Sequence, residues 1–218
     1  MSNMTSVSRI AFSLWLALAG GLYGGTVARA DDPAPPVRSL LEVRHRNVVL
    51  QQWDLSCAAA ALATILRYQH GEPVTERSVA LGLIDREEYI ANPGLVRLRQ
   101  GFSLLDLKRF ADGLGYRGIG LGQLEFPDLL ERAPIIVPVD LQGYPHFVVF
   151  RGATPNTVLL ADPAFGNVTM SIVKFMNGWI DYRDIGRVGF IVTESGTPAP
   201  PGRLSARALD FVVLRPSQ

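Results

Sequence analysis

The chain has 218 residues, of which 48% are hydrophobic and 19% are charged, a composition that predicts one globular domain with a sizeable core. Its formal net charge is +1, and no run of like charges favours a nucleic acid as partner. The single cysteine excludes an internal disulfide.

The first 30 residues have the pattern of a secretory signal peptide. Arg9 precedes a short apolar stretch, residues 10–22, and Ala28-Arg29-Ala30 is typical of a cleavage site. An uncleaved anchor is the alternative, although a spanning helix needs about 20 apolar residues. We expect an exported protein, periplasmic or secreted, that is cleaved after Ala30 and continues through a Pro-rich linker over residues 31–46.

The only cysteine, Cys57, lies where a polar stretch becomes almost wholly apolar. Ser56 is a candidate N-cap, and residues 57–70 favour a helix that ends at Gly71. The apolar run predicts that this helix is central and buried on most sides. In its first turn, free N–H groups and the helix dipole stabilise a negatively charged sulfur. A buried and inert thiol is the alternative interpretation.

The rest of the chain shows helical patterns first and strand patterns afterwards. Further helices are predicted over residues 75–83, 103–114, 126–132 and 171–179, and strands over residues 135–139, 147–150, 158–161 and 189–192. Residues 47–50 form a strand or an extended lead-in, residues 113–122 form turns around a short strand, and residues 84–101 have mixed polarity. This order predicts an α+β fold over residues 47–193, with N-terminal helices packed on an antiparallel sheet. The Pro- and Gly-rich tail, residues 194–218, is either disordered or adds an edge strand through residues 209–214.

A base for the thiol must come from three histidines. His70 lies on the helix of Cys57, about 20 Å along it at 1.5 Å per residue. His45 lies in the lead-in and is expected at the surface. His146 begins an apolar strand after a glycine and a proline, and it is therefore the candidate base.

A carboxylate for His146 is predicted on the following strand. If residues 152–156 form a five-residue loop, Arg151 pairs with Thr157, Phe150 with Val158, and His146 lies opposite Asp162. A carboxylate at that position can hold an imidazole. Asp140, one strand earlier, is the rival partner, and Asp162-Pro163 also fits an ordinary turn.

Donors for an oxyanion are predicted just before the cysteine. Gln51 and Gln52 both carry a side-chain amide there, and the physical chemistry of the sequence does not choose between them.

Together these residues resemble the C39 family of cysteine peptidases, over roughly residues 45–193. The resemblance rests on Q-x5-C at a helix start, on H-F-V-V-x-x-G, and on a strand that ends in D-P. It implies a papain-like fold, with Cys57 as nucleophile, His146 as general base and acid, and Asp162 as the residue that orients His146. It also implies Gln51 as oxyanion donor. The chain departs from the family by Ser56 in place of an acidic residue and Ala58 in place of glycine.

The resemblance implies an exported cysteine peptidase that hydrolyses a peptide bond of an extended peptide through a thioester. An acyl transferase with the same triad is a close variant. A non-catalytic peptide-binding or chaperone module of a functional-amyloid or bacteriocin-like export system is the alternative from another class, and an export-system component is a candidate partner. Neither a metal nor a cofactor is expected, because one cysteine and three dispersed histidines lack ligand spacing and residues 113–122 lack the lysine of a phosphate loop.

Overall fold

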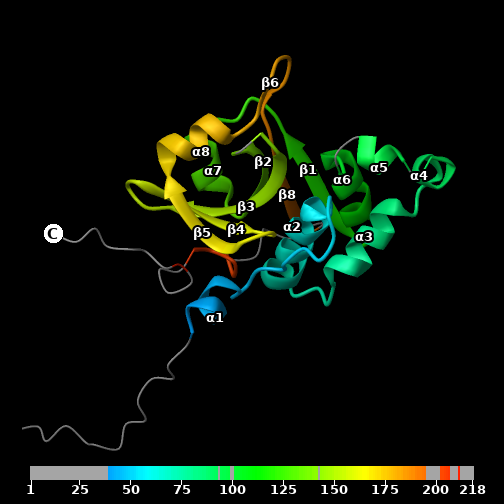
Figure 1. Ribbon diagram of the computed structural model, residues 1–218, viewed down its shortest axis with the longest axis horizontal. Helices are drawn as coiled ribbons and strands as arrows, with labels where there is room; N and C mark the ends of the chain where they lie inside the picture. Colours follow the sequence, from blue (N-terminus) through cyan, green and yellow to red (C-terminus); the bar gives the residue numbers. More distant parts are fainter. Residues whose placement is uncertain are drawn as a thin grey trace, which may run out of the picture. The chain divides into compact units, whose positions relative to one another are not determined.

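The computed structural model describes residues 39–92, 94–98, 101–141, 143–194, 202–206 and 211 (Figure 1). All of the described residues belong to one compact unit of the chain. The predicted signal peptide and the first part of the predicted linker lie outside the described residues.

The N-terminal half of the described chain is helical. Its elements are α1 (Leu40–Arg44), α2 (Cys57–Ile65), the π-helix η1 (Leu66–His70), α3 (Glu76–Ile84), α4 (Glu87–Ala91), α5 (Leu95–Leu98) and α6 (Leu104–Gly113). The helix predicted over residues 57–70 is confirmed as α2 continued by η1, and it ends at Gly71, whose φ of 81° is left-handed. Thr75 and Ser103 cap α3 and α6. The short helices α4 and α5 were not predicted, because residues 84–101 have no clear apolar period.

The C-terminal half forms an antiparallel sheet. Its strands are β1 (Tyr116–Leu121), β2 (Ile135–Asp140), β3 (Pro145–Ala153), β4 (Thr157–Asp162), β5 (Gly166–Ser171) and β8 (Gly189–Glu194), in the order β1-β8-β2-β3-β4-β5. Helices α7 (Phe126–Arg132) and α8 (Ile172–Gly178) and the hairpin of β6 (Asp181–Tyr182) and β7 (Gly186–Arg187) complete it. The predicted α+β class is confirmed. Strand β5 and the hairpin were missed, and residues 47–50 join neither sheet.

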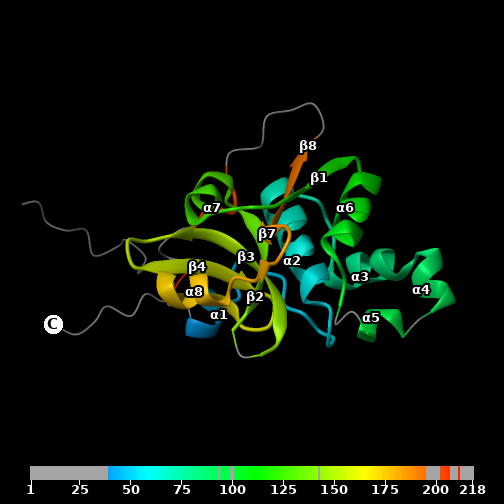
Figure 2. The same ribbon diagram turned by 90° about the horizontal axis from the view of Figure 1, so that it is seen from above.

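The six-stranded sheet separates two hydrophobic cores (Figures 1 and 2). Helices α2, α3 and α6 contribute to one core, and α7 and α8 contribute to the other. Strand β3 serves both, because Val149 lies in the first core while Val148 and Phe150 lie in the second. Every residue of α2 is buried, as predicted, so Cys57 is fixed at the start of the helix in the middle of the molecule.

The register between β3 and β4 differs from the predicted one. Phe150 pairs with Leu160, and Ala153 pairs with Val158, so the predicted pairs of Arg151 with Thr157 and of Phe150 with Val158 are wrong. The tip of the hairpin is shorter than predicted, and a bulge interrupts β3 between Phe150 and Gly152. The shorter tip alone would move the side chains before the bulge to the opposite face of the sheet relative to β4. The bulged residue, Arg151, returns them to the predicted face.

Arg151 is buried, and the C-terminal segment supplies most of its partners. Its Nε donates to the carbonyl of Leu204 at 2.8 Å, and its NH2 group donates to the carbonyl of Ser205 at 3.4 Å. Its NH1 group donates to Asn167 Oδ1 at 3.1 Å, and the ring of Phe211 lies 5.2 Å from the guanidinium. Part of the predicted tail is thus anchored by buried side chains, whereas most of the expected strand at residues 209–214 lies outside the described residues.

The second part of the predicted linker is folded. A Ser39 capping box starts α1, and Asn167 on β5 donates to the carbonyls of Val43 and Arg46. Gly166 lies so close to α1 that a β-carbon there would clash with the carbonyl oxygen of Arg44. The prediction of a linker through residue 46 is therefore wrong for residues 39–46, which pack against the sheet.

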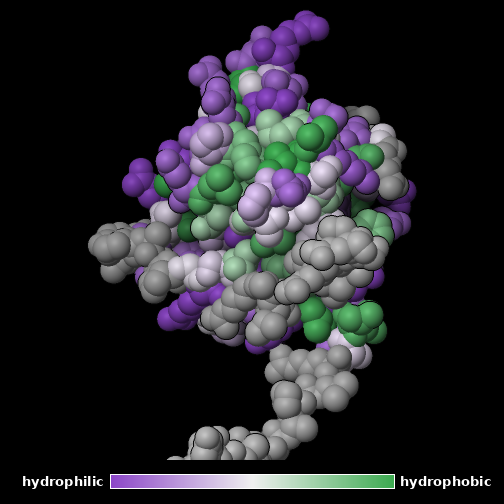
Figure 3. Space-filling model, turned by 90° about the vertical axis from the view of Figure 1, so that its left-hand side faces the viewer, coloured by the Kyte–Doolittle hydropathy of each residue, from purple (hydrophilic) through white to green (hydrophobic). Residues whose placement is uncertain are grey.

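None of the helices in the described ranges is long and apolar enough to cross a membrane. Figure 3 faces the side on which α8 lies, and hydrophobic side chains gather there below a hydrophilic projection formed by the β6–β7 hairpin.

The buried guanidinium gives a test of the anchored tail. We expect Arg151→Met to lower the free energy of unfolding by about 2–4 kcal/mol, because it leaves the buried Leu204 carbonyl and the buried Asn167 side-chain oxygen without this donor. Urea denaturation measures the change, and the exposed Arg132→Met is a control that should stay within about 0.5 kcal/mol. Equal effects of the two variants would contradict the anchoring role.

Candidate active site

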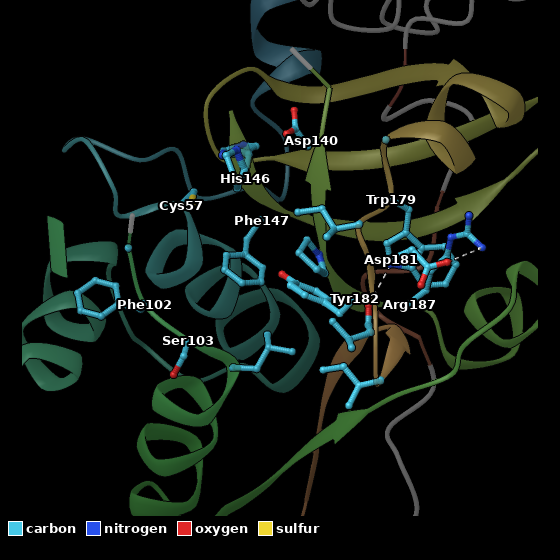
Figure 4. Close-up of a pocket in the computed structure, with 18 of the residues that line it drawn as sticks. Cys57, Phe102, Ser103, Asp140, His146, Phe147, Trp179, Asp181, Tyr182 and Arg187 are labelled. Atoms are coloured by element: carbon cyan, nitrogen blue, oxygen red, sulfur yellow. Dashed lines mark hydrogen bonds and ion pairs between the residues drawn. The ribbon is translucent and has the colours of Figure 1, made fainter. Parts of the chain in front are cut away.

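Cys57 and His146 line the same cleft, whose volume is about 1310 Å³ (Figure 4). One wall comes from the start of α6 and the residues before it, including Phe102 and Ser103. The opposite wall comes from α8 and the β6–β7 hairpin, including Trp179 and Tyr182. Most of the lining is apolar, so the cleft suits an extended peptide with apolar side chains.

His146 forms a hydrogen bond with Asp162, with 2.9 Å between Nε2 and Oδ1. The two residues are not directly opposed, because the observed register shifts the pairing by two residues from the predicted one. A shift of two keeps both side chains on the same face, where diagonal neighbours remain within reach. The predicted contact between His146 and Asp162 is therefore present, although the register of β3 and β4 that produces it differs from the predicted one.

Asp162 is held by the turn that follows its strand. Its Oδ1 also accepts hydrogen bonds from the backbone N–H groups of Ala164 at 2.7 Å and Phe165 at 3.2 Å. The carboxylate is only 4% exposed, so it has little freedom to leave the imidazole. The turn and the contact with His146 were alternatives for this residue in the sequence, and the structure contains both.

The environment of His146 favours its protonated form. Burial alone would lower its pKa, but the hydrogen bond with Asp162 and the neighbouring Cys57, together with the negative charges of both groups, raise it to about 9. Cys57 comes from the helix on one face of the sheet and Asp162 from a strand. His146 lies between them, as a general base between a nucleophile and an orienting carboxylate does.

Gln51 lies close to His146 and Asp162, and its hydrogen bonds are to backbone carbonyls of neighbouring loops. It lines a second cavity of about 420 Å³, which it shares with His146 and Asp162. Its backbone N–H donates to the carbonyl of Pro163 at 2.8 Å, and its Nε2 donates to that of Trp53 at 3.3 Å. Its Oε1 is buried and has no hydrogen-bond partner among the described residues.

The other candidates have different surroundings. Asp140 lines the cleft, but its Oδ1 accepts from the N–H of Gly143. His70 contacts the carbonyl of Val192 and the carboxylate of Glu194, and His45 is exposed. Within the described part of the chain, no three His, Cys, Asp or Glu side chains are grouped as metal ligands.

Several residues that line the two cavities had no sequence signal. The cleft includes Arg187, which lies over the Trp179 ring and 3.9 Å from the carboxylate of Asp181 (Figure 4). Tyr144 has a pKa raised first by burial and then by the negative charges of Cys57 and Asp54. These residues come from a two-residue strand pair and from a loop, which no periodic pattern reveals.

The chain is similar to known peptidases in sequence. The model of the peptidase C39 family matches residues 45–183. A Pseudomonas fluorescens protein described as a probable functional amyloid protease FapD is 38% identical over 176 residues, which cover 78% of this chain and 76% of that protein. A Pseudomonas aeruginosa protein of the same description is also 38% identical over 176 residues, covering 78% of this chain and 74% of that protein.

Solved structures show the same fold. The peptidase domain of Streptococcus ComA, an ABC transporter involved in quorum sensing, superposes with a TM-score of 0.54 at 18% identity, covering 69% of this chain and all of that domain. A double glycine motif protease from an AMS/PCAT transporter, in complex with the leader peptide, superposes with a TM-score of 0.52 at 23% identity. The match covers 66% of this chain and 89% of that protease. With this fold, and with a family match over more than half its length, the chain belongs to the peptidase C39 family and is a cysteine-type peptidase of α+β, papain-like architecture.

Proposed function

We propose that this peptidase cleaves its substrate through a triad of Cys57, His146 and Asp162. The observation that carries the proposal is the position of His146, which hydrogen-bonds Asp162 at 2.9 Å and lines the same cleft as Cys57. Asp162 and Cys57 together raise the pKa of His146 to about 9. An imidazolium beside a sulfur at a helix start favours the thiolate, which is the nucleophilic form.

The reaction then follows from the proton on His146. The Cys57 thiolate attacks the carbonyl carbon of the scissile bond and forms a tetrahedral oxyanion. His146 donates its proton to the leaving amine, and the C–N bond breaks to give a thioester. Neutral His146 next takes a proton from water, whose oxygen attacks the thioester, so the acid product leaves and the thiolate–imidazolium pair returns.

The proposed oxyanion donors are the Cys57 backbone N–H and the Gln51 side-chain amide. Gln51 supports this role by its place beside His146 and Asp162. Its Nε2 now donates to the Trp53 carbonyl at 3.3 Å, near the long end of the range for hydrogen bonds, so a developing oxyanion is the stronger acceptor.

We further propose that the substrate is an extended segment of a protein handled by an export system, and that the peptidase is itself exported. The cleft between α6 and the β6–β7 hairpin supports an extended segment. The relatives described as functional amyloid proteases and the related peptidase bound to a leader peptide support the substrate class. The pattern of residues 1–30 supports export and cleavage after Ala30.

Cleavage of a peptide library tests the triad. Purified chain is incubated with peptides from a digested bacterial proteome, new termini are found by mass spectrometry, and kcat/KM is measured on the best peptide. We expect Cys57→Ala and His146→Ala to lower kcat/KM by at least about 10³-fold, because they remove the nucleophile and the base. Asp162→Asn should lower it by about 10²–10⁴-fold.

Asp140→Asn is the matched control. It removes a carboxylate from the same cleft and keeps an oxygen for the Gly143 N–H, so kcat/KM should change by less than about threefold. Undiminished cleavage by Cys57→Ala would contradict the proposed mechanism. A larger effect of Asp140→Asn than of Asp162→Asn would make Asp140 the orienting residue.

Titration of His146 should link stability to pH. Because its pKa is raised from 6.5 to about 9 on folding, its protonated form stabilises the fold fully below pH 6.5, and this contribution is lost as pH rises through 9. We expect the difference in unfolding free energy between wild type and Asp162→Asn to be largest near about pH 6 and to shrink towards about pH 10. A difference that grows over this range, in urea denaturation, would contradict the assignment.

A further inference from the structure

The loop that joins the two proposed oxyanion donors is held by a carboxylate from another helix. Glu76, the first residue of α3, is only 3% exposed. Its Oε1 accepts from the backbone N–H of Gln52 at 2.9 Å and from the Ser56 hydroxyl at 2.5 Å. Gln52 directly follows Gln51, and Ser56 directly precedes Cys57, so one buried oxygen ties both ends of the loop.

The contact with Glu76 also changes what Ser56 does at the start of α2. Ser56 has the N-cap position, where its hydroxyl would be expected to accept from an N–H of the first turn. It makes no such cap and instead lies against Glu76 and the Trp53 carbonyl, 2.7 Å away. The Ser56 hydroxyl therefore holds the loop to α3 and does not cap the first turn of α2.

The loop needs such a restraint. Leu55, within it, has a φ of 67°, a left-handed conformation that leucine disfavours and that persists only when the surroundings enforce it. Beyond Glu76, the Gln51 N–H is bound to the carbonyl of Pro163, directly after Asp162. Among the residues that the structure describes, none hydrogen-bonds the second oxygen of Glu76, the buried Oε2, an arrangement that is costly for a carboxylate.

We propose that Glu76 is a positioning residue of the active site. By holding Gln52 and Ser56, it fixes the loop of residues 52–56 and so presents the Gln51 amide and the Cys57 backbone N–H to the oxyanion. This inference rests on the proposed triad mechanism. It adds a requirement outside the triad, because Glu76 is not among the residues that line the cleft and it acts through its hydrogen bonds to the loop.

The test compares Glu76→Ala with Thr75→Ala, using full-length chain and the best peptide from the library. Thr75 caps the same helix, and its side chain hydrogen-bonds Ser78 of that helix, so its replacement should lower the melting temperature and leave kcat within about threefold. Glu76→Ala should lower kcat by about 10–100-fold with little change in KM, because misplaced donors weaken only the transition state. Glu76→Gln keeps an acceptor oxygen and should restore kcat to within about threefold of wild type.

Alkylation of Cys57 by iodoacetamide distinguishes an effect on oxyanion stabilisation from an effect on the reactivity of the thiol. It needs no peptide substrate. Its rate at neutral pH should stay within about threefold in Glu76→Ala, because alkylation makes no oxyanion. If Glu76→Ala does not fold, Glu76→Asp replaces it, since it keeps the charge and withdraws the carboxylate from the loop by one methylene. We expect the same loss of kcat for Glu76→Asp.

Equal losses of kcat in the Thr75 and Glu76 variants at equal melting temperature would reduce Glu76 to a stabilising residue and overturn the inference. Equal losses of alkylation and kcat would also overturn it, because Glu76 would then act on the sulfur. A Cys57→Ala variant that still cleaves the peptide would instead contradict the proposed mechanism, whatever the Glu76 variants do.

Discussion

The face of the sheet that His146 occupies depends on one extra residue in β3. With the observed hairpin tip and without the bulge, Val149 would lie opposite Asp162, and His146 would point to the other face. The bulge at Arg151 restores the alternation, and the hydrogen bond between His146 and Asp162 follows from it. The bulged residue is in turn fixed by carbonyls of residues 204 and 205. The active-site geometry thus depends on a buried guanidinium and a C-terminal segment outside the region that matches the family.

Buried polar contacts set the site on an otherwise apolar scaffold. Helix α2 is buried throughout, so its packing fixes the position of Cys57. The neighbouring loops have no periodic apolar face, and single polar side chains fix them instead: Thr64 binds the N–H of Val49, Glu76 binds that of Gln52, and Asn167 binds carbonyls near α1. In a low-dielectric interior each such contact is costly to break, which makes these side chains effective at holding loops in one conformation.

The sequence predicted those parts of the molecule that have a repeating pattern. The helix of Cys57, the capped starts of α3 and α6 and the central strands follow from apolar periods and cap residues, and the α+β order follows from them. The contact between His146 and Asp162 was predicted for a register that is wrong, because an unforeseen four-residue turn and an unforeseen bulge together shift the pairing by an even number of residues. A bulge, a two-residue hairpin and the reach of Glu76 from α3 depend on tertiary contacts, which leave no period in the sequence.

The most direct test of this account is the rate of Cys57 alkylation as a function of pH, in wild type and in His146→Ala. If His146 and Cys57 form a thiolate–imidazolium pair, the wild type should reach half its maximal rate well below the value of about 8.5 that is usual for a free thiol. His146→Ala should need a higher pH to reach half its own maximum. An unreactive thiol, or one with the same pH profile in both proteins, would contradict the account.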